Sequence, residues 1–326
     1  VRLIINVIMV TLVFEFVGGL ILSLRFLAEF PVDRAFAFGF FHSVSAFCNA
    51  GFDLFGQVFG PYASLTHYTS DWTVSLTIGG LFVFGGLGFP VIIELLKFPK
   101  TRRFTLHTKV VLSVTGLLIV VGTIVIFLFE HNNPETLGGQ NFSGKLLGTV
   151  FQSITPRTAG FNTLDISKMH VASWLIIIIL MFFGASPSST GGGIKTTTFG
   201  ILLATVMASV RGKHDVEMFE RRFPQDLINK SITIMFIALA WVFFVSLVMS
   251  AVESHSYIRL LFEVMSAFGT VGLSTGITPS LLNISKILLI LTMFIGRIGP
   301  LTVMIALTDI ERKPGGRYIT DHVMIG

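Results

Sequence analysis

The sequence predicts an all-α polytopic membrane protein built from tandem repeats of helix, loop and helix. Of its 326 residues, 52% are hydrophobic and only 13% are charged. Several apolar runs reach the length of about 20 residues that a helix needs to cross a bilayer. Three small-residue loops also align around a central glycine, at Gly51, Gly160 and Gly272, separated by 109 and then 112 residues. Such regular internal repetition is a strong architectural signal.

Each predicted repeat contains a spanning run, a short apolar run, a loop and a second spanning run. The repeats occupy residues 1–100, 101–215 and 216–326. The runs expected to span are 3–28, 72–96, 110–129, the stretch from 171 onward, 231–252 and 284–308, and the short runs are 35–48, 144–155 and 257–268. Runs this short are typical of re-entrant or buried segments. Residues 56–70 are expected to form an exposed loop.

Basic residues predict the orientation. Segments 97–109, 211–230 and 311–317 together hold thirteen Lys and Arg residues, against six on the side that includes the loops. The positive-inside rule places these segments in the cytoplasm and the mouths of the loops outside the cell membrane. The same basic stretches can contact anionic lipid head groups. Their location explains the net charge of +5, so no nucleic-acid partner is expected.

The three aligned loops predict an ion pathway arranged pseudo-symmetrically around one axis. Irregular backbone at membrane depth is tolerated only where it is buried in protein or lines a water-filled cavity. Inward carbonyl oxygens can then replace the hydration shell of K⁺, and 270–273 departs from the channel string Thr-Val-Gly-Tyr only at its last residue. The predicted ion-binding residues are Asn49, Ala50, Gly51, Thr158, Ala159, Gly160, Thr270, Val271 and Gly272.

A second irregular stretch interrupts the spanning run that begins at residue 171. It reads Gly184, Ala185, Ser186, Pro187, Ser188, Ser189, Thr190, Gly191, Gly192 and Gly193, followed by Lys195. Proline cannot continue the helical hydrogen bonding and glycine weakens it. The break is expected only in this repeat, because the corresponding runs of the other two stay apolar. The stretch is either a movable gate beneath the loops or a static packing kink.

Arg297 is the other outlier, near the middle of the run 284–308. A charge facing lipid there costs about 3 kcal/mol on insertion scales, so Arg297 is expected to face the pore or a polar partner. It is either an electrostatic barrier below the loops, hydrogen-bonded to 184–193, or a structural residue that ties carbonyl groups together.

Several isolated polar residues carry more modest expectations. Arg157 is expected to anchor its loop to a carboxylate, and His42 to be packed and hydrogen-bonded. Cys48, the single cysteine, excludes an internal disulfide framework and is expected to be a small filler behind the loops. Asp53 either attracts cations at the outer mouth or caps the backbone. Glu15 and Glu94 are expected to have structural roles.

The chain resembles the Trk/Ktr/HKT superfamily of cation transporters, and within it most closely the bacterial potassium-uptake membrane subunits of the KtrB type. The stretches that carry the resemblance are 153–162, Ser-Ile-Thr-Pro-Arg-Thr-Ala-Gly-Phe-Asn, 191–197, Gly-Gly-Gly-Ile-Lys-Thr-Thr, and 294–300, Phe-Ile-Gly-Arg-Ile-Gly-Pro. The family has four repeats around a pore. The three repeats here match its second to fourth, so a first repeat is expected to be missing from this sequence.

The resemblance implies potassium uptake through a channel-like pore. The three loops would form the selectivity filter, with glycine at its centre associated with K⁺ selection, and 184–193 would be an intramembrane gate. It also implies a homodimer, regulated by a cytosolic nucleotide-binding subunit of the KtrA/TrkA type that contacts the inner basic segments. K⁺ is the expected transported ion, Na⁺ is possible, and no organic cofactor is expected on this chain.

Two other classes are weighed against this interpretation. An enzyme is not expected: Gly184-Ala-Ser186 lacks a histidine base in the later spans, and residues 191–196 lack the glycine directly before lysine that a P-loop needs. A Na⁺-coupled or Na⁺-permeable secondary transporter with broken helices stays open as the alternative. Such folds usually repeat with inverted topology, whereas repeats of two spans each share one orientation.

Overall fold

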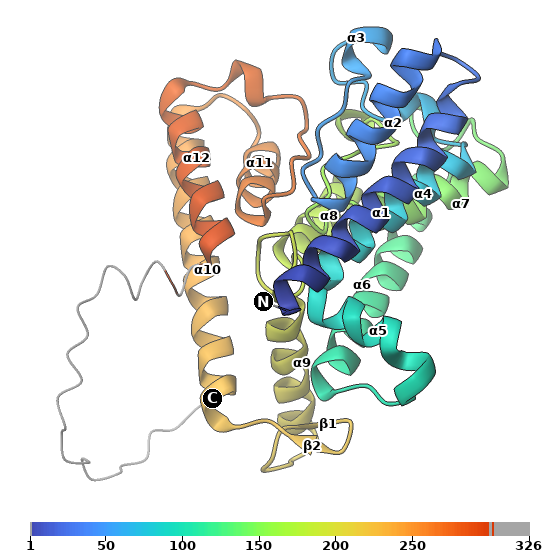
Figure 1. The fold of residues 1–326 in the computed structure, drawn as a ribbon. Helices are drawn as coiled ribbons and strands as arrows, with labels where there is room; N and C mark the ends of the chain where they lie inside the picture. The colour runs from blue at the N-terminus through green and yellow to red at the C-terminus, as the bar shows by residue number, and fades with distance from the viewer. Residues whose placement is uncertain (1, 300–301, 303–326) are drawn as a thin grey trace.

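Most of the chain is helical in the computed structural model, which describes residues 2–299 and residue 302 (Figure 1). The helices are α1 (Arg2–Phe26), α2 (Val32–Phe47), α3 (Gly56–Phe59), α4 (Trp72–Leu87), α5 (Phe89–Thr101), α6 (Leu106–Glu130), α7 (Phe142–Ile154), α8 (Val171–Phe182), α9 (Thr196–Val210), α10 (Gln225–Val252), α11 (Tyr257–Gly269) and α12 (Asn283–Ile298). Short 3₁₀ turns lie at Thr66–Tyr68, Ile166–Lys168 and Thr278–Ser280. The strands β1 (Glu217–Met218) and β2 (Arg221–Arg222) pair as a small antiparallel hairpin.

The helices follow the same order three times. A long helix, a short helix, an irregular loop and a further helical segment recur as α1–α2–α4, α6–α7–α8 and α10–α11–α12. Helices α10, α11 and α12 pack together on one side of the molecule and α1, α2 and α4 on the other, with α8 between them (Figure 1). Short helix α3 and the β1–β2 hairpin lie at opposite ends.

Among the described residues, three single helices are long and apolar enough to cross a membrane. They are Ile4–Phe26, Leu106–Glu130 and Gln225–Val252, and the bent pair α4–α5 passes the same test when taken together. The expected uninterrupted span over 72–96 is wrong, because the chain bends by 104° between α4 and α5. Gly88 takes a φ of +89° at the bend, and Pro90 begins the next helix without needing a backbone donor.

Local capping explains where several helices begin. The side chains of Asp71, Thr105 and Asn141 accept hydrogen bonds from backbone N–H groups in the first turns of α4, α6 and α7. These N–H groups have no partner within the helix itself. A side-chain oxygen at the N-cap satisfies one of them and contributes about 1 kcal/mol.

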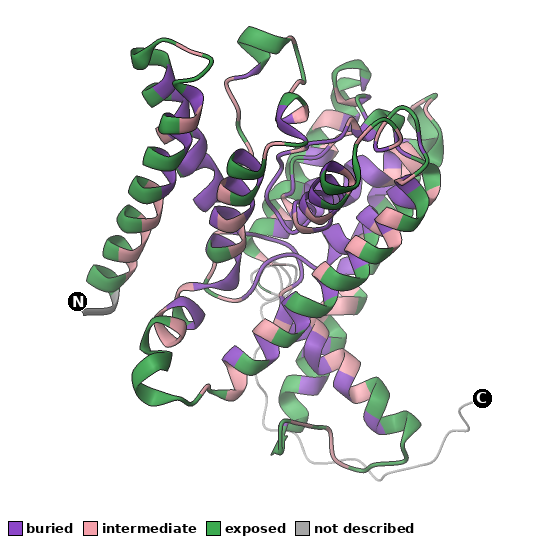
Figure 2. Cartoon of the chain, turned by 90° about the vertical axis from the view of Figure 1, so that its right-hand side faces the viewer, coloured by how far each residue is buried: buried purple, intermediate pink, exposed green. Residues whose placement is uncertain are grey.

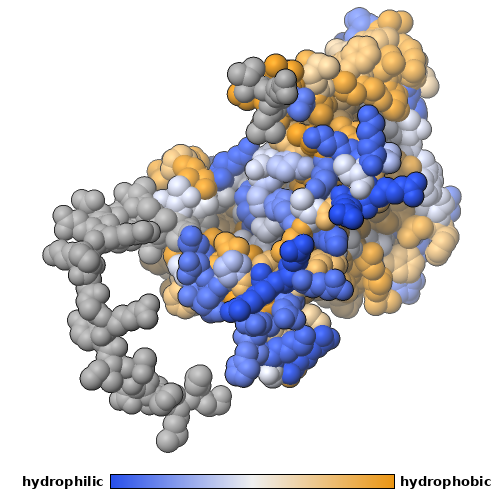
Figure 3. Space-filling model, turned by 60° about the horizontal axis from the view of Figure 1, so that its bottom comes forward, coloured by the Kyte–Doolittle hydropathy of each residue, from blue (hydrophilic) through white to orange (hydrophobic). Residues whose placement is uncertain are grey.

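Apolar side chains lie on both the inside and the outside of the bundle. Leu22, Ile78 and Phe262 are fully buried, whereas Phe16 on α1 and Phe236 on α10 are exposed. Figure 2 shows buried residues gathered between the helices and exposed residues on their outward faces. Outward apolar faces are what a bilayer requires. Hydrophilic residues instead gather at the end of the molecule that carries the β1–β2 hairpin (Figure 3).

Residues 56–70 differ from the exposed loop that the sequence predicts. Leu65 and Tyr68 in this stretch are buried in a cluster with Phe26 and Phe55. The prediction relied on the polar and turn-forming residues of this stretch. It did not account for the contacts that Leu65 and Tyr68 make with aromatic residues of other elements. The basic segment 311–317 and residues 303–308 of the last expected span lie outside the described residues.

Candidate functional site

The three predicted loops, hereafter the pore loops (residues 49–53, 158–162 and 270–274), converge. A methyl group built on Gly51 would lie 2.7 Å from the carbonyl oxygen of Ala159 and 2.9 Å from the Cα of Gly160. A methyl group on Gly160 would lie 2.6 Å from the carbonyl oxygen of Val271. One on Gly272 would lie 3.5 Å from the Cα of Gly160. The backbones therefore meet so closely at Gly51 and Gly160 that a side chain would not fit.

The backbone follows the same unusual course in each pore loop. Asn49, Thr158 and Thr270 have φ values of +52°, +72° and +51°, and the glycine two residues later has φ of +73°, +84° and +92°. The residue between each pair is not left-handed. A left-handed conformation is rare for a β-branched residue such as threonine and marks a position that its surroundings impose. The sequence alignment predicted the glycines but not this alternation.

In an ordinary β-strand, successive residues point to opposite sides. When left-handed residues alternate with others, successive backbone polar groups point to the same side. The carbonyl oxygens of Ala159 and Val271 each lie nearest to the glycine of the neighbouring loop. Backbone carbonyl oxygens at a constriction are groups that can hold a partly dehydrated cation. At its base, the loops are joined by a 3.1 Å hydrogen bond from Asn49 Nδ2 to Thr158 Oγ1.

Above the constriction lies a polar cavity of about 1300 Å³. Gly51, Gly160 and Gly272 form part of its lining, together with acidic and basic side chains from all three repeats. The charged lining residues are Asp53, Glu135, Asp165, Lys168 and Lys286. The central glycines of the three pore loops therefore line one shared cavity rather than separate pockets.

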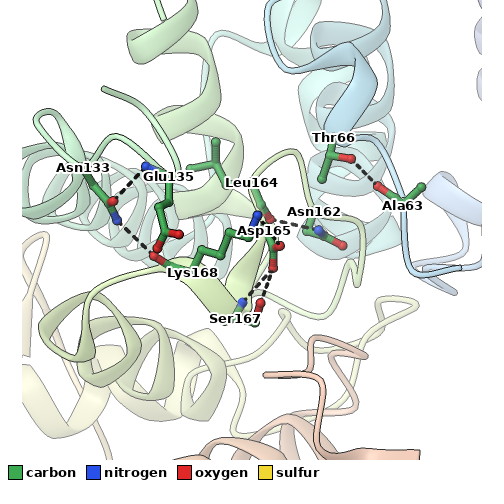
Figure 4. Close-up of polar contacts among 9 residues, drawn as sticks. All are labelled: Ala63, Thr66, Asn133, Glu135, Asn162, Leu164, Asp165, Ser167 and Lys168. Carbon is green, nitrogen blue, oxygen red and sulfur yellow. Dashed lines mark hydrogen bonds and ion pairs between the residues drawn. The ribbon is translucent and has the colours of Figure 1, made fainter. Parts of the chain in front are cut away.

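Hydrogen bonds and an ion pair connect residues in the wall of this cavity (Figure 4). Asn133 Nδ2 donates to the Lys168 carbonyl oxygen at 3.0 Å, and Lys168 Nζ lies 3.8 Å from Asp165 Oδ2. Asp53 caps the backbone as one of its two expected roles, since its Oδ1 accepts from the Phe55 N–H at 2.9 Å, and the residue also lines the cavity. These contacts hold the rim of the cavity in place.

The broken segment 184–193 lies directly beneath the pore loops. Thr190 Oγ1 donates to Asn49 Oδ1 at 3.1 Å. A methyl group on Gly191 would overlap Thr158 Oγ1, and one on Gly192 would overlap Thr270 Oγ1. The segment thus touches the first left-handed residue of every pore loop. The backbones of Phe183 and Ile194, which flank the segment, pair with each other. The end of α8 and the start of α9 are therefore held close together.

Backbone contacts attach this segment to the neighbouring repeats. The Ser186 N–H donates to the Gly86 carbonyl at 2.9 Å, the Phe89 N–H donates to the Ser188 carbonyl at 3.1 Å, and the Gly193 N–H donates to the Gly296 carbonyl at 3.2 Å. The segment is therefore clasped between the α4–α5 bend and the end of α12. The expectation of a break in this repeat alone is wrong, because the α4–α5 bend interrupts the corresponding run of the first repeat as well.

Two cationic side chains hold adjacent carbonyl groups of the segment. Lys195 Nζ donates to the Gly191 carbonyl at 2.8 Å. Arg297 Nη1 donates to the Thr190 carbonyl, so the expected hydrogen bond between Arg297 and 184–193 is present. Arg297 lies in the last turn of α12, and it is exposed below the pore loops.

The expectations for three other polar residues have mixed outcomes. His42 is fully buried and hydrogen-bonded, as predicted. Arg157 is buried but donates to Thr115 Oγ1 at 3.1 Å; among the described residues no carboxylate pairs with it, so the predicted anchor is wrong. Cys48 is exposed, with Sγ 3.5 Å from Glu15 Oε1, and is not a filler. Cys48 and Asn49 directly follow the end of α2, and of the two it is Asn49 whose side chain is buried.

Side chains that brace the pore loops from behind were missed at the sequence level. Ser45 Oγ donates to the Phe52 carbonyl at 2.8 Å, and Thr155 Oγ1 donates to the Phe161 carbonyl. Both carbonyls belong to the residue directly after a central glycine. In the second loop, the Leu65 N–H from the preceding repeat also donates to the Asn162 carbonyl at 3.0 Å. Ser45 lies six residues before Gly51 and Thr155 lies five residues before Gly160, so no common spacing marked these residues in the sequence.

Comparison with known proteins identifies the family. A family model for TrkH, described as a cation transport protein, matches residues 1–313. The Ktr system potassium uptake protein B of Bacillus subtilis is 38% identical over 310 residues, covering 94% of this chain and 68% of that protein. The potassium/sodium uptake protein NtpJ of Enterococcus hirae is 38% identical over 332 residues, covering all of this chain and 72% of that protein.

A solved structure supports the same fold. The crystal structure of the potassium transporter TrkH from Vibrio parahaemolyticus matches with a TM-score of 0.71 at 17% identity, covering 91% of this chain and 62% of that one. At this identity the likeness concerns the fold alone. The family match over nearly the whole sequence, the similarity to Ktr proteins and the apolar helices agree: this chain belongs to the TrkH family of multi-pass membrane cation transporters.

Proposed function

We propose that this chain forms most of a potassium-uptake pore in which the three pore loops select the ion and segment 184–193 gates its passage. The observation that carries the proposal is the convergence of Gly51, Gly160 and Gly272, each with positive φ, at the floor of one outer cavity. Backbone carbonyls at such a constriction favour a weakly hydrated cation such as K⁺. The names of the Ktr relatives support potassium as the transported ion.

The ring of loops is proposed to contain a fourth member. Residues 158–160 of the middle loop are buried between their neighbours, whereas Ala50 and Gly272 of the flanking loops are exposed. The space between these two loops would be closed by another pore loop, supplied by a repeat that precedes 1–100. Repeats 1–100, 101–215 and 216–326 would then be the second to fourth of the complete pore.

The gate is proposed to work by displacement of residues 184–193. The segment touches Asn49, Thr158 and Thr270 from below, so an ion leaving the pore loops must pass it. Arg297 adds a positive charge at the same level, which opposes a cation in a site of low dielectric constant. Movement of the segment would open the path, and its contact with the α4–α5 bend and α12 gives neighbouring helices a way to drive it.

The transporter is proposed to be a homodimer in the cell membrane, with the outer cavity facing outside and segments 97–109 and 211–230 facing the cytoplasm. The basic residues of these segments favour that orientation. A cytosolic nucleotide-binding subunit would act on them, as the word "system" in the names of the Ktr relatives suggests. Na⁺ permeation or coupling is the second candidate, which the name of the potassium/sodium uptake protein NtpJ supports.

Uptake of ⁸⁶Rb⁺ into proteoliposomes by the full-length protein tests the proposal. Parent protein should take up Rb⁺ in a manner that K⁺ competes with and Na⁺ does not. Gly272→Ser should fold, because a methyl group there comes no closer than 3.5 Å to other atoms, but should weaken the preference for K⁺ over Na⁺. Absence of K⁺-competed uptake by the parent would refute the transport function. An unchanged ion preference in Gly272→Ser would refute the role of the pore loops.

A further inference from the structure

Two pore loops are held from behind in the same way by chemically different side chains. His42 and Glu263 both lie nine residues before a central glycine, Gly51 and Gly272 respectively. His42 Nε2 accepts from the backbone N–H of Leu54 at 3.2 Å, and Glu263 Oε1 accepts from the backbone N–H of Thr275 at 2.9 Å. Each of these N–H groups lies three residues after its glycine. Helices α2 and α11 therefore grip their loops at one shared position.

The Glu263 carboxylate is the more extensively bonded of the two. Its Oε1 also accepts from Ser274 Oγ at 2.8 Å and from Thr275 Oγ1 at 3.2 Å, and its Oε2 accepts from Thr278 Oγ1 at 2.7 Å. The residue is 5% exposed, and no cationic side chain pairs with it in the described part of the chain. Four donors from the outer half of one loop thus converge on a single buried carboxylate. Hydrogen bonds to a charged group are about twice as strong as those between neutral groups.

His42 reaches the same result with a neutral ring. A backbone N–H can only donate, so Nε2 must be the accepting nitrogen, and the proton lies on Nδ1, which donates to the Phe38 carbonyl at 2.6 Å. The ring is fully buried and stacks on Phe55 with the ring centres 4.4 Å apart. The imidazole therefore fixes both Leu54 and Phe55, the residues through which the first pore loop leaves the constriction.

The middle repeat lacks this contact. Phe151 occupies the position nine residues before Gly160 and packs on Phe82 instead. Its loop is held by the preceding repeat: the Asn162 N–H is 3.1 Å from Ser64 Oγ, and Thr69 Oγ1 donates to the Thr163 carbonyl at 2.6 Å. The first and third pore loops are thus held by a residue of their own short helix, whereas the middle loop is held by the preceding repeat.

We propose that His42 and Glu263 are positioning residues that set the ion preference of the pore by fixing the outer halves of the first and third pore loops. The inference rests on the proposed function. A carbonyl ring discriminates between K⁺ and Na⁺ only while its oxygens keep their spacing and number. Release of the Leu54 or Thr275 N–H lets the adjacent loop relax, and the smaller Na⁺ then gains the close contacts that the fixed loop denies it.

Matched substitutions separate positioning from general stability. Glu263→Met removes the acceptors with little change of shape, whereas Glu263→Gln keeps an acceptor for the Thr275 N–H. His42→Phe copies the residue found naturally at Phe151. The control is Glu130→Met: Glu130 is a fully buried carboxylate that accepts from Asn133, Thr136 and the His170 N–H, but it braces α6 against α8 and not a pore loop.

The ratio of Rb⁺ to Na⁺ uptake is measured with the full-length protein in proteoliposomes. In Glu263→Met and His42→Phe this ratio should fall by roughly fivefold or more, because each variant loses about one hydrogen bond to a buried acceptor. Glu263→Gln should stay within about twofold of the parent. Glu130→Met should lower the unfolding temperature without changing the ratio. A folded Glu263→Met or His42→Phe with the parent's ratio overturns the proposal, as does an equal change in Glu130→Met.

Hydrogen–deuterium exchange tests the contact apart from transport. Peptides covering 272–278 should exchange faster in Glu263→Met than in Glu263→Gln, and those covering 52–56 faster in His42→Phe. Unchanged exchange in these variants would overturn the positioning role, whether or not the protein transports Rb⁺. If exchange changes in the variants but the parent takes up no Rb⁺, only the proposed function is refuted. If Glu263→Met fails to fold, His42→Phe decides, since phenylalanine is already tolerated at that position in α7.

Discussion

At the scale of single residues, the three central glycines of the pore loops differ in how much room they leave for a side chain. Gly51 and Gly160 face the carbonyl oxygens of the next loop, while Gly272 faces more open space. All three glycines have left-handed φ values. A side chain at any of them costs about 1–2 kcal/mol in backbone strain, but only the first two add a steric clash. The glycines are therefore equivalent in sequence and unequal in packing.

This inequality predicts different effects of alanine substitution. Gly51→Ala should abolish Rb⁺ uptake, because its methyl group would lie 2.7 Å from the Ala159 carbonyl oxygen and displace the adjoining loop. Gly272→Ala should retain part of the uptake, with only backbone strain to absorb. Initial rates in proteoliposomes, corrected for the amount of folded protein, measure the difference. Equal loss in both variants would contradict the close packing of the first two loops.

Arg297 carries a second prediction at this scale. Its guanidinium lies beneath the pore loops and holds the Thr190 carbonyl. Arg297→Ala should raise Rb⁺ flux severalfold, because a positive charge and a tie on segment 184–193 are removed together. Arg297→Lys keeps the charge and should stay near the parent rate. An unchanged rate in a well-folded Arg297→Ala would leave the arginine with a structural role only.

At the scale of elements, the segment 184–193 matters through its contacts with elements distant in sequence. It meets the first pore loop, the α4–α5 bend and the end of α12. Most of these contacts are ordinary hydrogen bonds, each worth about 1 kcal/mol net, and the bond from Arg297 to the Thr190 carbonyl, with its charged donor, is about twice as strong. A segment held by several weak, replaceable contacts can leave its position without unfolding the helices around it.

Thr190 is the residue through which that attachment can be tested. Thr190→Val keeps the shape and removes the hydroxyl that donates to Asn49 Oδ1, so the closed position should lose about 1 kcal/mol and basal Rb⁺ flux should rise about fivefold. Thr205→Val is the matched control, since the Thr205 hydroxyl bonds only the Ile201 carbonyl within α9. If both variants raise the flux equally, the attachment at Thr190 does not hold the gate.

At the scale of the whole molecule, the distribution of charged and apolar surface is that of a multi-pass membrane protein. Apolar side chains face outward along α1 and α10, and hydrophilic residues gather at the β1–β2 end (Figure 3). Helix α3 and the loop after it, which line part of the cavity, lie at the opposite end of the bundle from the hairpin (Figure 1). In the proposed orientation, the cavity end would receive the ion and the hairpin end would face the cytosolic subunit.

Single-cysteine labelling tests this orientation. In a Cys48→Ala background, Tyr62→Cys should react with a membrane-impermeant maleimide in intact cells, because Tyr62 is exposed at the cavity end. Lys213→Cys, at an exposed position beside the hairpin, should react only after the cells are permeabilised. The reverse pattern would show that the basic segments face outside.

Much of this organisation could be predicted from the sequence. Hydropathy and the spacing of Gly51, Gly160 and Gly272 were sufficient for the threefold order of helices and for the approximate bounds of the short helices. These features depend on local composition and on repetition, which a linear sequence records directly. The break at 184–193 was likewise visible, because proline and consecutive glycines disrupt any helix wherever it lies.

Tertiary structure alone decided the rest. The bend at Gly88, the left-handed threonines at 158 and 270, and the acceptor roles of His42 and Glu263 all arise from contacts between segments distant in sequence. The sequence predicted a carboxylate partner for Arg157 and a buried Cys48, and both predictions were wrong. Which side of a helix end faces inward depends on the neighbours packed against it, and no local pattern encodes the position of those neighbours.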